Sequence, residues 1–305
     1  MSTVRLARSD EIPAKLTRGN DEAAAYLDTL LDKGCTRPEW CFVAEDDGEV
    51  SGSVVLWSMP DAEVPSDFVL WDAPWDSDGL ATGRALLDAA AKAAAEAGAS
   101  RQGHVLDSPT QPPQFQDHAK EREELLRASG FDVARDGLRY RWRAGDAVVS
   151  PDAGLTWKSL EELGHDPFVD LLENILDDTR DSLLQADVKE HGLRCAAEIF
   201  WAECLEFEHR PQWFEIGFDG DEPAAISLAG RNPTVAVVCF VGVSPKHRGK
   251  GYATAAASRC TEVLVGADAE EIRGDCDASN VAMAKGFERA GYENFARRLE
   301  FVREL

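Results

Sequence analysis

Residues 243–253 read Val243-Ser244-Pro245-Lys246-His247-Arg248-Gly249-Lys250-Gly251-Tyr252-Ala253. They follow an apolar run at 235–243, which is typical of a buried strand, and lead into an alanine-rich run at 253–265, which is typical of a helix. Gly249 and Gly251 let the backbone approach an anion closely. The free N–H groups and the positive end of the helix dipole would face that anion. The stretch therefore predicts a phosphate-binding turn, to which Arg248 and Lys250 add charge.

Three other interpretations compete for this turn. An ordinary strand-to-helix turn with solvated basic residues needs no ligand at all. A Walker A loop is excluded because G-x-x-x-x-G-K-[ST] is absent and Lys250 is followed by Gly251. A Rossmann turn is excluded because no G-x-G-x-x-G opens the helix.

The turn closely resembles the acyl-CoA loop of the GNAT superfamily, the general N-acetyltransferases, written V-x-P-x-x-[RQ]-x-x-G-x-[GA]. Each fixed position is met, by Val243, Pro245, Arg248, Gly251 and Ala253. Downstream, residues 277–280 (Asp-Ala-Ser-Asn) resemble the end of the family's fifth strand. Residues 282–292 resemble the helix written N-x-x-A-x-x-[LF]-Y-E-[RK]-x-G-[FY].

The resemblance implies a binding site for acetyl-CoA as co-substrate, with no metal. Backbone N–H groups of the loop would hold the pyrophosphate, and an N–H of a bulge near residues 241–243, assigned to Val243, would donate to the oxyanion. Asn280 would touch the pantetheine or the loop. The implied cofactor-binding residues are Val243, Arg248, Gly249, Lys250, Gly251, Tyr252, Ala253 and Asn280.

The chain departs from the family where protons are handled. The usual glutamate base on the fourth strand is replaced at Val237, and the usual tyrosine acid is replaced by Phe287. Glu215 and Asp277 are the replacement candidates for catalysis. Each is also readily explained as a surface carboxylate, since ionisable residues are mostly solvated.

Other candidates are weaker. Glu206, Glu208 and His209 precede the hairpin that carries Glu215, and each is more simply a surface or loop group. Cys239 has no histidine patterned with it, so a buried small side chain is a simpler interpretation than a nucleophile.

The two halves of the chain share an order of predicted elements, which indicates a duplicated α/β domain. Each copy is expected to be a mixed, mostly antiparallel sheet flanked by helices. The domains are predicted at 1–146 and 154–305, with a linker near 144–154. In the second copy, 166–184 and 188–205 are predicted to be helical.

The first copy lacks the acyl-CoA loop. At the matching place, residues 71–79 read Trp-Asp-Ala-Pro-Trp-Asp-Ser-Asp-Gly, whose three aspartates would repel a pyrophosphate. The first half is therefore predicted to be a degenerate GNAT-like copy.

Composition limits the function classes. The chain has 305 residues, 44% of them hydrophobic, and a net charge of −24. Such a surface repels nucleic acid and anionic lipid, and no apolar run reaches the roughly 18 residues of a membrane span. The start of the chain lacks the apolar core of a signal peptide. Seven scattered cysteines without a C-x-x-C pair are typical of buried thiols in a cytoplasmic protein.

The sequence therefore favours an acyl-CoA-dependent N-acyltransferase that acts by direct transfer on a small amine, as a monomer or homodimer. The acidic surface and Glu206, Glu208, Glu215 and Asp219 favour a cationic amine, although the charge is also explained as solubilising. The alternative from another class is a non-catalytic acyl-CoA-binding or ligand-sequestering protein. The missing glutamate and tyrosine favour this alternative, and the complete loop favours the enzyme.

Overall fold

The computed structural model describes the chain except for residues 1, 61, 77–78, 152 and 233. The chain divides into two compact units. Unit 1 comprises Met1–Asp136 together with Arg297–Leu305, and unit 2 comprises Gly137–Ala296. No helix in the described ranges is both long enough and apolar enough to cross a membrane.

Unit 1 is built on a sheet with the strand order β1-β2-β3-β4-β5-β12. All neighbours in it are antiparallel except β4 and β5, which are parallel. Its elements are β1 (Thr3–Leu6), α1 (Asp21–Asp32), a 3₁₀ turn η1 (Pro38–Trp40), β2 (Cys41–Asp46), β3 (Glu49–Trp57), β4 (Asp67–Asp72), α2 (Gly79–Glu96), β5 (Arg101–Ser108), α3 (Ala119–Ala128), the start of β6 (Asp132–Arg143) and the end of β12 (Glu293–Glu304).

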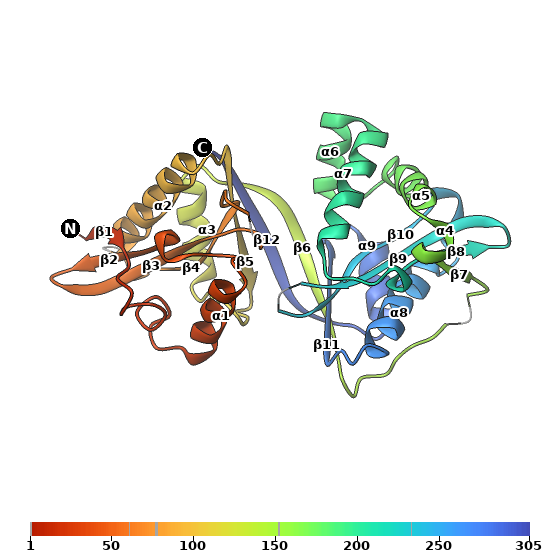
Figure 1. Cartoon of the computed structure of the whole chain (residues 1–305), viewed down its shortest axis with the longest axis horizontal. Coiled ribbons are helices and arrows are strands. Elements are labelled where there is room, and N and C mark those ends of the chain that lie inside the picture. Colours follow the sequence, from red (N-terminus) through yellow and green to blue (C-terminus); the bar gives the residue numbers. More distant parts are fainter. Residues whose placement is uncertain (1, 61, 77–78, 152, 233) are drawn as a thin grey trace. The chain divides into compact units, whose positions relative to one another are not determined.

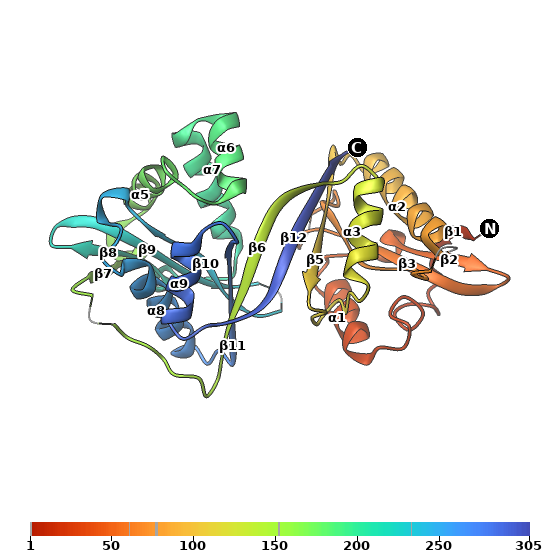
Figure 2. The ribbon, with the colours of Figure 1, turned by 180° about the vertical axis from the view of Figure 1, so that it is seen from behind.

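Helices cover both faces of this sheet, because side chains alternate between the faces of a strand. Val54 of β3 packs in a core that α2 and α3 complete, whereas the adjacent Val55 packs in a core that α1 completes. Figures 1 and 2 show α2 and α3 on one face and α1 on the other.

Unit 2 repeats this plan with the strand order β6-β11-β10-β9-β8-β7. Its parallel pair is β10 and β11. Its further elements are β7 (Thr156–Ser159), α4 (Leu160–Leu163), α5 (Asp166–Leu176), α6 (Ser182–His191), α7 (Leu193–Glu206), η2 (Pro211–Trp213), β8 (Phe214–Asp219), β9 (Glu222–Arg231), β10 (Ala236–Val243), η3 (Pro245–His247), α8 (Tyr252–Val265), β11 (Glu271–Asp277) and α9 (Val281–Arg289).

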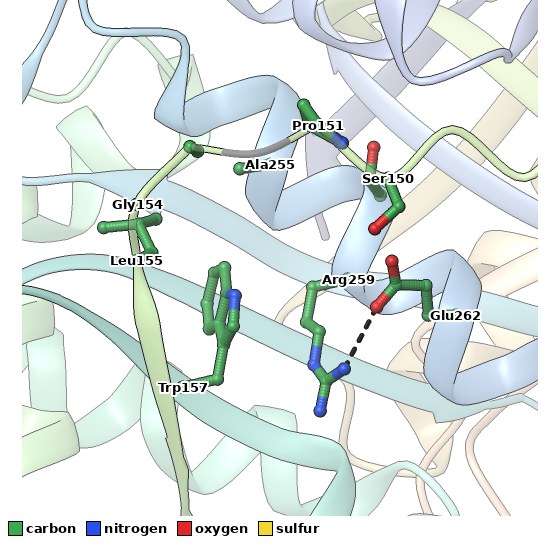
Figure 3. A pocket seen from close by; sticks show the side chains of 10 residues that line it. Ser150, Pro151, Gly154, Leu155, Trp157, Ala255, Arg259 and Glu262 are labelled. Atoms are coloured by element: carbon green, nitrogen blue, oxygen red, sulfur yellow. Dashed lines mark hydrogen bonds and ion pairs between the residues drawn. The ribbon is translucent and has the colours of Figure 1, made fainter.

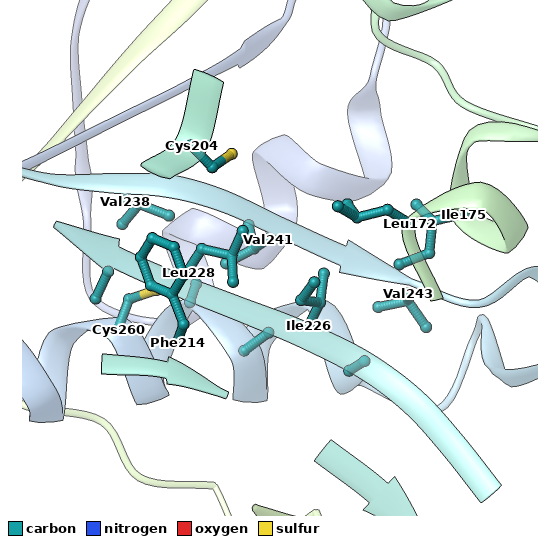
Figure 4. Packing of buried hydrophobic residues seen from close by; sticks show 14 of the residues in the cluster. Leu172, Ile175, Cys204, Phe214, Ile226, Leu228, Val238, Val241, Val243 and Cys260 are labelled. Atoms are coloured by element: carbon teal, nitrogen blue, oxygen red, sulfur yellow. The ribbon is translucent and has the colours of Figure 1, made fainter. Parts of the chain in front are cut away.

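Consecutive residues of β8 show that helices cover both faces here too. The ring of Phe214 packs edge-on against Trp201 of α7, and the neighbouring Glu215 binds Arg259 of α8. On the α5 side, Val243 of β10 lies near Leu172 and Ile175 in the apolar core (Figure 4). The predicted fold class, with a mixed and mostly antiparallel sheet and flanking helices in each copy, is confirmed.

The continuous helix predicted over 166–184 is wrong. Helix α5 ends at Leu176, and α6 begins at Ser182. Asp181 caps the new helix, because its side chain accepts the N–H groups of Leu183 and Leu184. Residues 177–182 are all polar, but apolar residues resume at Leu183 and Leu184, seven and eight positions after Leu176, so the helical phase is kept across the break.

The last strand of each half contributes to the unit formed mainly by the other half. Arg297 to Glu304 of β12 pair antiparallel with Ser108 to Arg101 of β5 in unit 1. In unit 2, Gly137 to Arg143 of β6 pair with Asp277 to Glu271 of β11. The sequence ranges 1–146 and 154–305 describe the repeat along the chain, whereas each compact unit draws residues from both ranges.

Phe301 makes this exchange testable, because it lies in β12 yet is 2% exposed within the core of unit 1. We expect Phe301→Ala to lower the free energy of unfolding by about 3–5 kcal/mol, the usual cost of removing a buried ring. Hydrogen exchange should accelerate at residues 101–108. Leu305→Ala, at a position 39% exposed, is the control and should change little. Unchanged exchange at 101–108 in the Phe301 variant would contradict the strand assignment.

Candidate functional site

The turn at residues 243–253 is an open helix start. Gly249 has a φ of +81° and Gly251, the N-cap residue of α8, a φ of +85°. A Cβ built at either glycine would have nothing within 4 Å, and no side chain caps the helix. Among the described residues, the backbone N–H groups of 249–254 have no hydrogen-bond partner. Six such groups around one helix N-terminus suit an anion.

The basic side chains of this turn are already paired with carboxylates. Lys250 Nζ lies 2.7 Å from Asp219 Oδ2, and Lys246 Nζ lies 3.0 Å from Glu222 Oε2. The hydrogen bond from Lys250 holds the pKa of Asp219 below its usual value, and Asp219 raises the pKa of Lys250. Arg248 forms an ion pair with Asp178. The free N–H groups, rather than unpaired cations, are therefore the feature of the turn that suits an anion.

Strands β10 and β11 pair at their beginnings and then diverge. Ala236 pairs with Ile272 and Val237 with Arg273, and the described residues beyond them form no further pair between the two strands. We call the region between residues 238–243 and 274–277 the β10/β11 fork. Strands β10 and β11 are parallel, so both run toward its mouth.

Backbone groups of β10 face this fork. Ser244 N–H donates to Ala224 O of β9 at 2.9 Å. Hydrogen-bonded and non-hydrogen-bonded pairs alternate in an antiparallel ladder. The N–H groups of Val243 and Val241 therefore point away from β9 and toward the fork. These are the donors that the fork offers to a ligand.

The bulge expected near residues 241–243 lies earlier in the strand, between Val238 and Phe240. The extra residue is Cys239, and Gly230 makes room for it: a Cβ on Gly230 would meet Cys239 Sγ at 2.7 Å. Burial raises the pKa of the Cys239 thiol well above its usual value, which opposes a role as a nucleophile.

Asn280 precedes α9, and Phe287 lies within it. The Asn280 side chain caps α9 by accepting the N–H of Met283 at 3.2 Å. Phe287 is 1% exposed, and its ring covers Gly274 and approaches Val238 at the point where β10 and β11 part. The Phe287 ring also stacks on Tyr140 at 5.0 Å and packs edge-on against Tyr292 at 5.3 Å. Phe287 thus closes the base of the fork with an apolar ring that has no proton to donate.

Both candidate catalytic carboxylates are engaged in structural contacts. Glu215 is buried on the α8 side of the sheet and binds Arg259 through two hydrogen bonds of 2.7 and 2.9 Å. Asp277 is buried at the end of β11, where its Oδ2 accepts the Ser182 N–H at 2.9 Å and the Ser182 hydroxyl. Glu215 is therefore remote from the fork, whereas Asp277 borders its mouth.

The weaker candidates lie away from the turn. Glu206 and Glu208 are exposed, and the Glu208 backbone forms an isolated bridge with Arg231. His209 Nδ1 lies 2.8 Å from Phe207 O, and the ring stacks on Phe214.

Residues 174–182 were not recognised from the sequence as part of this site. They contain the last turn of α5, the loop to α6 and the first residue of α6. Asn174, Asp178 and Ser182 contact Ser244, Arg248 and Asp277 respectively. The capping pair Asp181-Ser182 is the signal that would have located the break.

In unit 1, the equivalent fork is filled by the chain itself. Between β4 and β5 the one register pair in the described residues is Asp67 with Gly103. Beyond it, Gln114 Oε1 accepts the Leu70 N–H at 3.2 Å, and Gln116 Nε2 donates to Val105 O at 2.7 Å. Side chains thus occupy backbone groups on both strands.

The helix start of unit 1 is blocked as well. Asp76 Oδ1 accepts the Gly79 N–H at 2.8 Å, and a Cβ on Gly79 would meet Pro74 O at 2.0 Å. Buried Arg122 donates to Trp71 O and lies 3.2 Å from Asp72. Ser77 and Asp78, two residues of the predicted repulsive loop, lie outside the described residues.

A pocket of about 330 Å³ lies between α8 and residues 150–157 (Figure 3). Trp157, Ser258 and Arg259 line it together with residues 150–155 of the linker, of which Asp152 is not described. Arg259 donates to Glu262 at 3.0 Å in addition to Glu215. The residues that line this pocket do not include any residue of the turn at 243–253. The described residues contain no group of three or more His, Cys, Asp or Glu side chains placed to hold a metal ion.

Residues 172–292 match the model of the acetyltransferase (GNAT) family. The matched residues all lie in unit 2. The matched residues include the turn, the fork and most of α5 through α9. No curated protein sequence matches the chain.

Solved structures of this superfamily share the fold over nearly the whole chain. A GCN5-related N-acetyltransferase from Sphaerobacter thermophilus is 14% identical, with a TM-score of 0.62, and the alignment covers 99% of this chain and 95% of that one. One from Kribbella flavida is 17% identical, with a TM-score of 0.56, over 92% and 93%. A tandem GNAT protein from the clavulanic acid biosynthesis pathway is 14% identical, with a TM-score of 0.51, over 100% and 98%. At these identities the likeness establishes the fold.

The contrast between the two helix starts predicts one acyl-CoA site per chain. We expect a calorimetric titration with acetyl-CoA to saturate at one equivalent, because unit 1 fills its own fork and caps its own helix. Saturation at two equivalents would show that residues 111–122 give way to a ligand.

Proposed function

We propose that this protein is an acyl-CoA-dependent N-acyltransferase that transfers an acetyl group from acetyl-CoA directly to a small amine. The observation that carries the proposal is the uncapped start of α8, with its unpartnered N–H groups, immediately beside the β10/β11 fork. The family match supports the same reading.

The turn fits a pyrophosphate. Its two positive-φ glycines leave open space where a side chain would stand, and the N–H groups of 249–254 have no partner among the described residues. Asn280 lies at the start of α9 and caps it through its carbonyl oxygen. The proposed contact residues are Val243, Arg248, Gly249, Lys250, Gly251, Tyr252, Ala253 and Asn280.

The fork supplies donors for the chemical step. When a neutral amine attacks a thioester, the new C–N bond forms, negative charge develops on the carbonyl oxygen, and the C–S bond then breaks to leave a thiolate. The Val243 N–H is the proposed donor to that oxygen, and Val241 offers a second N–H on the same edge. Fixed backbone donors of this kind need no reorganisation during the reaction.

In this proposal, water at the mouth of the fork accepts and donates the protons of the reaction. The attacking amine loses a proton and the leaving thiolate gains one. Glu215 is held by Arg259, and Asp277 is committed to Ser182. Asp277, at the end of β11, is the carboxylate placed to orient such a water. Phe287 contributes nothing to protonation.

Gly251→Asp tests the site. The new carboxylate would stand in the anion space, so we expect affinity for CoA to fall at least about tenfold, equivalent to ~1.4 kcal/mol. Gly192→Asp is the matched control, since Gly192 also has a positive φ of +80° and open space around it but lies between α6 and α7. Calorimetry giving equal CoA affinity for the two variants would refute the assignment of the turn.

The alternative is a non-catalytic acyl-CoA-binding protein. The commitment of both candidate carboxylates and the apolar Phe287 favour it. Release of free thiol from acetyl-CoA in the presence of an amine panel decides between the two. Release above the rate without protein, and abolished by Gly251→Asp, supports the enzyme. Tight CoA binding without release across the panel supports the alternative.

We further propose that the acceptor amine is cationic. The chain carries a net charge of −24, and residues 177–181 beside the fork's mouth contain three aspartates and one arginine. Asp219 and Glu215, which the sequence suggested for this role, are paired with Lys250 and Arg259.

The charge proposal predicts a salt dependence. Screening sets in over about 8 Å at physiological ionic strength. We therefore expect KM for a cationic amine to rise with added salt, and more steeply than KM for a neutral analogue. Salt-independent KM values, or a preference for anionic acceptors, would leave the acidic surface with a purely solubilising role.

A further inference from the structure

Residues 174–182, which we call the strap, connect the ends of the two strands that form the fork. At one end, Ser244 Oγ donates to Asn174 Oδ1 at 2.7 Å, just after β10. At the other, Ser182 donates to Asp277 at the end of β11. Ser244 and Asp277 are 1% and 4% exposed. The strap is thus anchored at buried positions on both sides of the fork's mouth.

The middle of the strap is held by the phosphate turn. Arg248 Nη1 forms an ion pair with the Asp178 carboxylate, and Nη2 donates to Asp178 O at 2.9 Å. Arg248 Nε points to Val243 O at 3.4 Å, at the edge of the fork. Each nitrogen of the Arg248 guanidinium therefore faces an acceptor on the strap or on β10.

Arg248 stands between two competing anions. It is one of the residues proposed to contact the pyrophosphate, and that contact and the Asp178 ion pair use the same planar group of donors. The Asp178 side chain is 69% exposed, so the pair is weak and easily replaced. The pyrophosphate, held by the neighbouring N–H groups, carries two negative charges, whereas a carboxylate carries one.

We propose that Asp178 and the bound phosphate compete for Arg248, so that binding of the acyl-CoA frees the middle of the strap. Asp178 is then a positioning residue that acts through Arg248. In the free protein its ion pair with Arg248 holds the strap across the fork's mouth, and this ion pair breaks when the cofactor binds. The amine would gain access after the thioester is in place. This inference rests on the proposed function of the turn.

Competition has a reciprocal consequence. If phosphate binding weakens strap closure by some factor, strap closure weakens phosphate binding by the same factor. Removing the Asp178 carboxylate should therefore tighten CoA binding. A purely structural role for Asp178 predicts the reverse, since loosening the site would weaken binding.

The test is CoA titration of the full chain carrying Asp178→Asn. We expect Kd to fall roughly two- to fivefold, because an exposed ion pair contributes at most about a fivefold factor. Asp177→Asn is the matched control. It removes the same charge from the adjacent exposed residue, which makes no ion pair among the described residues, and should shift Kd less than about twofold. Asp178→Ala repeats the test with a different side chain.

Hydrogen exchange at residues 177–182 gives an independent readout. In the wild type it should accelerate when CoA is added, and in Asp178→Asn it should already be fast without CoA. The inference is overturned if CoA binding is unchanged or weaker in both Asp178 variants, or if residues 177–182 become more protected from exchange when CoA binds. The proposed function still holds in these cases as long as the wild type binds CoA. Absence of CoA binding in the wild type removes both.

Discussion

The divergence of β10 from β11 is the constraint on which the site depends. Two parallel register pairs join the strands, and beyond them the N–H groups of Val241 and Val243 face no strand partner. Backbone polar groups away from water need partners, so an edge exposed inside a sheet is a place that something must fill. In unit 2 the helix after β10 starts uncapped beside that edge. An extended ligand with an anionic end matches both features at once.

In unit 1, side chains from the connecting loop bind the backbone groups that the diverging strands β4 and β5 leave unpaired. Its connection from β5 to α3 spans residues 109–118, whereas β11 and α9 in unit 2 are separated by residues 278–280 alone. The longer connection brings Gln114 and Gln116 to the open backbone of β4 and β5. The connection in unit 1 is about seven residues longer, a length that loops accommodate readily, and its side chains fill the position that corresponds to the β10/β11 fork. Duplication of the fold therefore does not imply duplication of the site.

The sequence predicted what repeats locally and missed what depends on distant partners. The turn, its flanking strand and helix, and the doubled α/β order follow from spacing and glycine placement. The break at 177–181 was missed because the apolar residues on its two sides keep one helical phase, although the segment itself is polar and Asp181 caps a new helix. The exchange of β6 and β12 could not be predicted, since the sequence of a strand has the same pattern whichever sheet the strand joins. Glu215 gave a plausible acid–base candidate because its partner Arg259 lies 44 positions away.

Neighbouring side chains and backbone groups, and not the net negative charge of the whole chain, determine the electrostatic environment of the turn. The turn's cations Lys246, Arg248 and Lys250 each meet a carboxylate from the β8–β9 turn or the strap. A protein with a net charge of −24 can hold a phosphate there because hydrogen bonds and the helix dipole act within a few ångströms, whereas salt screens the more distant carboxylates. The paired carboxylates nearest the turn offset its cations in the free protein. An arriving anion therefore gains a cation mainly by displacing a partner, and Asp178, the most exposed of the three carboxylates, is the one that gives way at least cost.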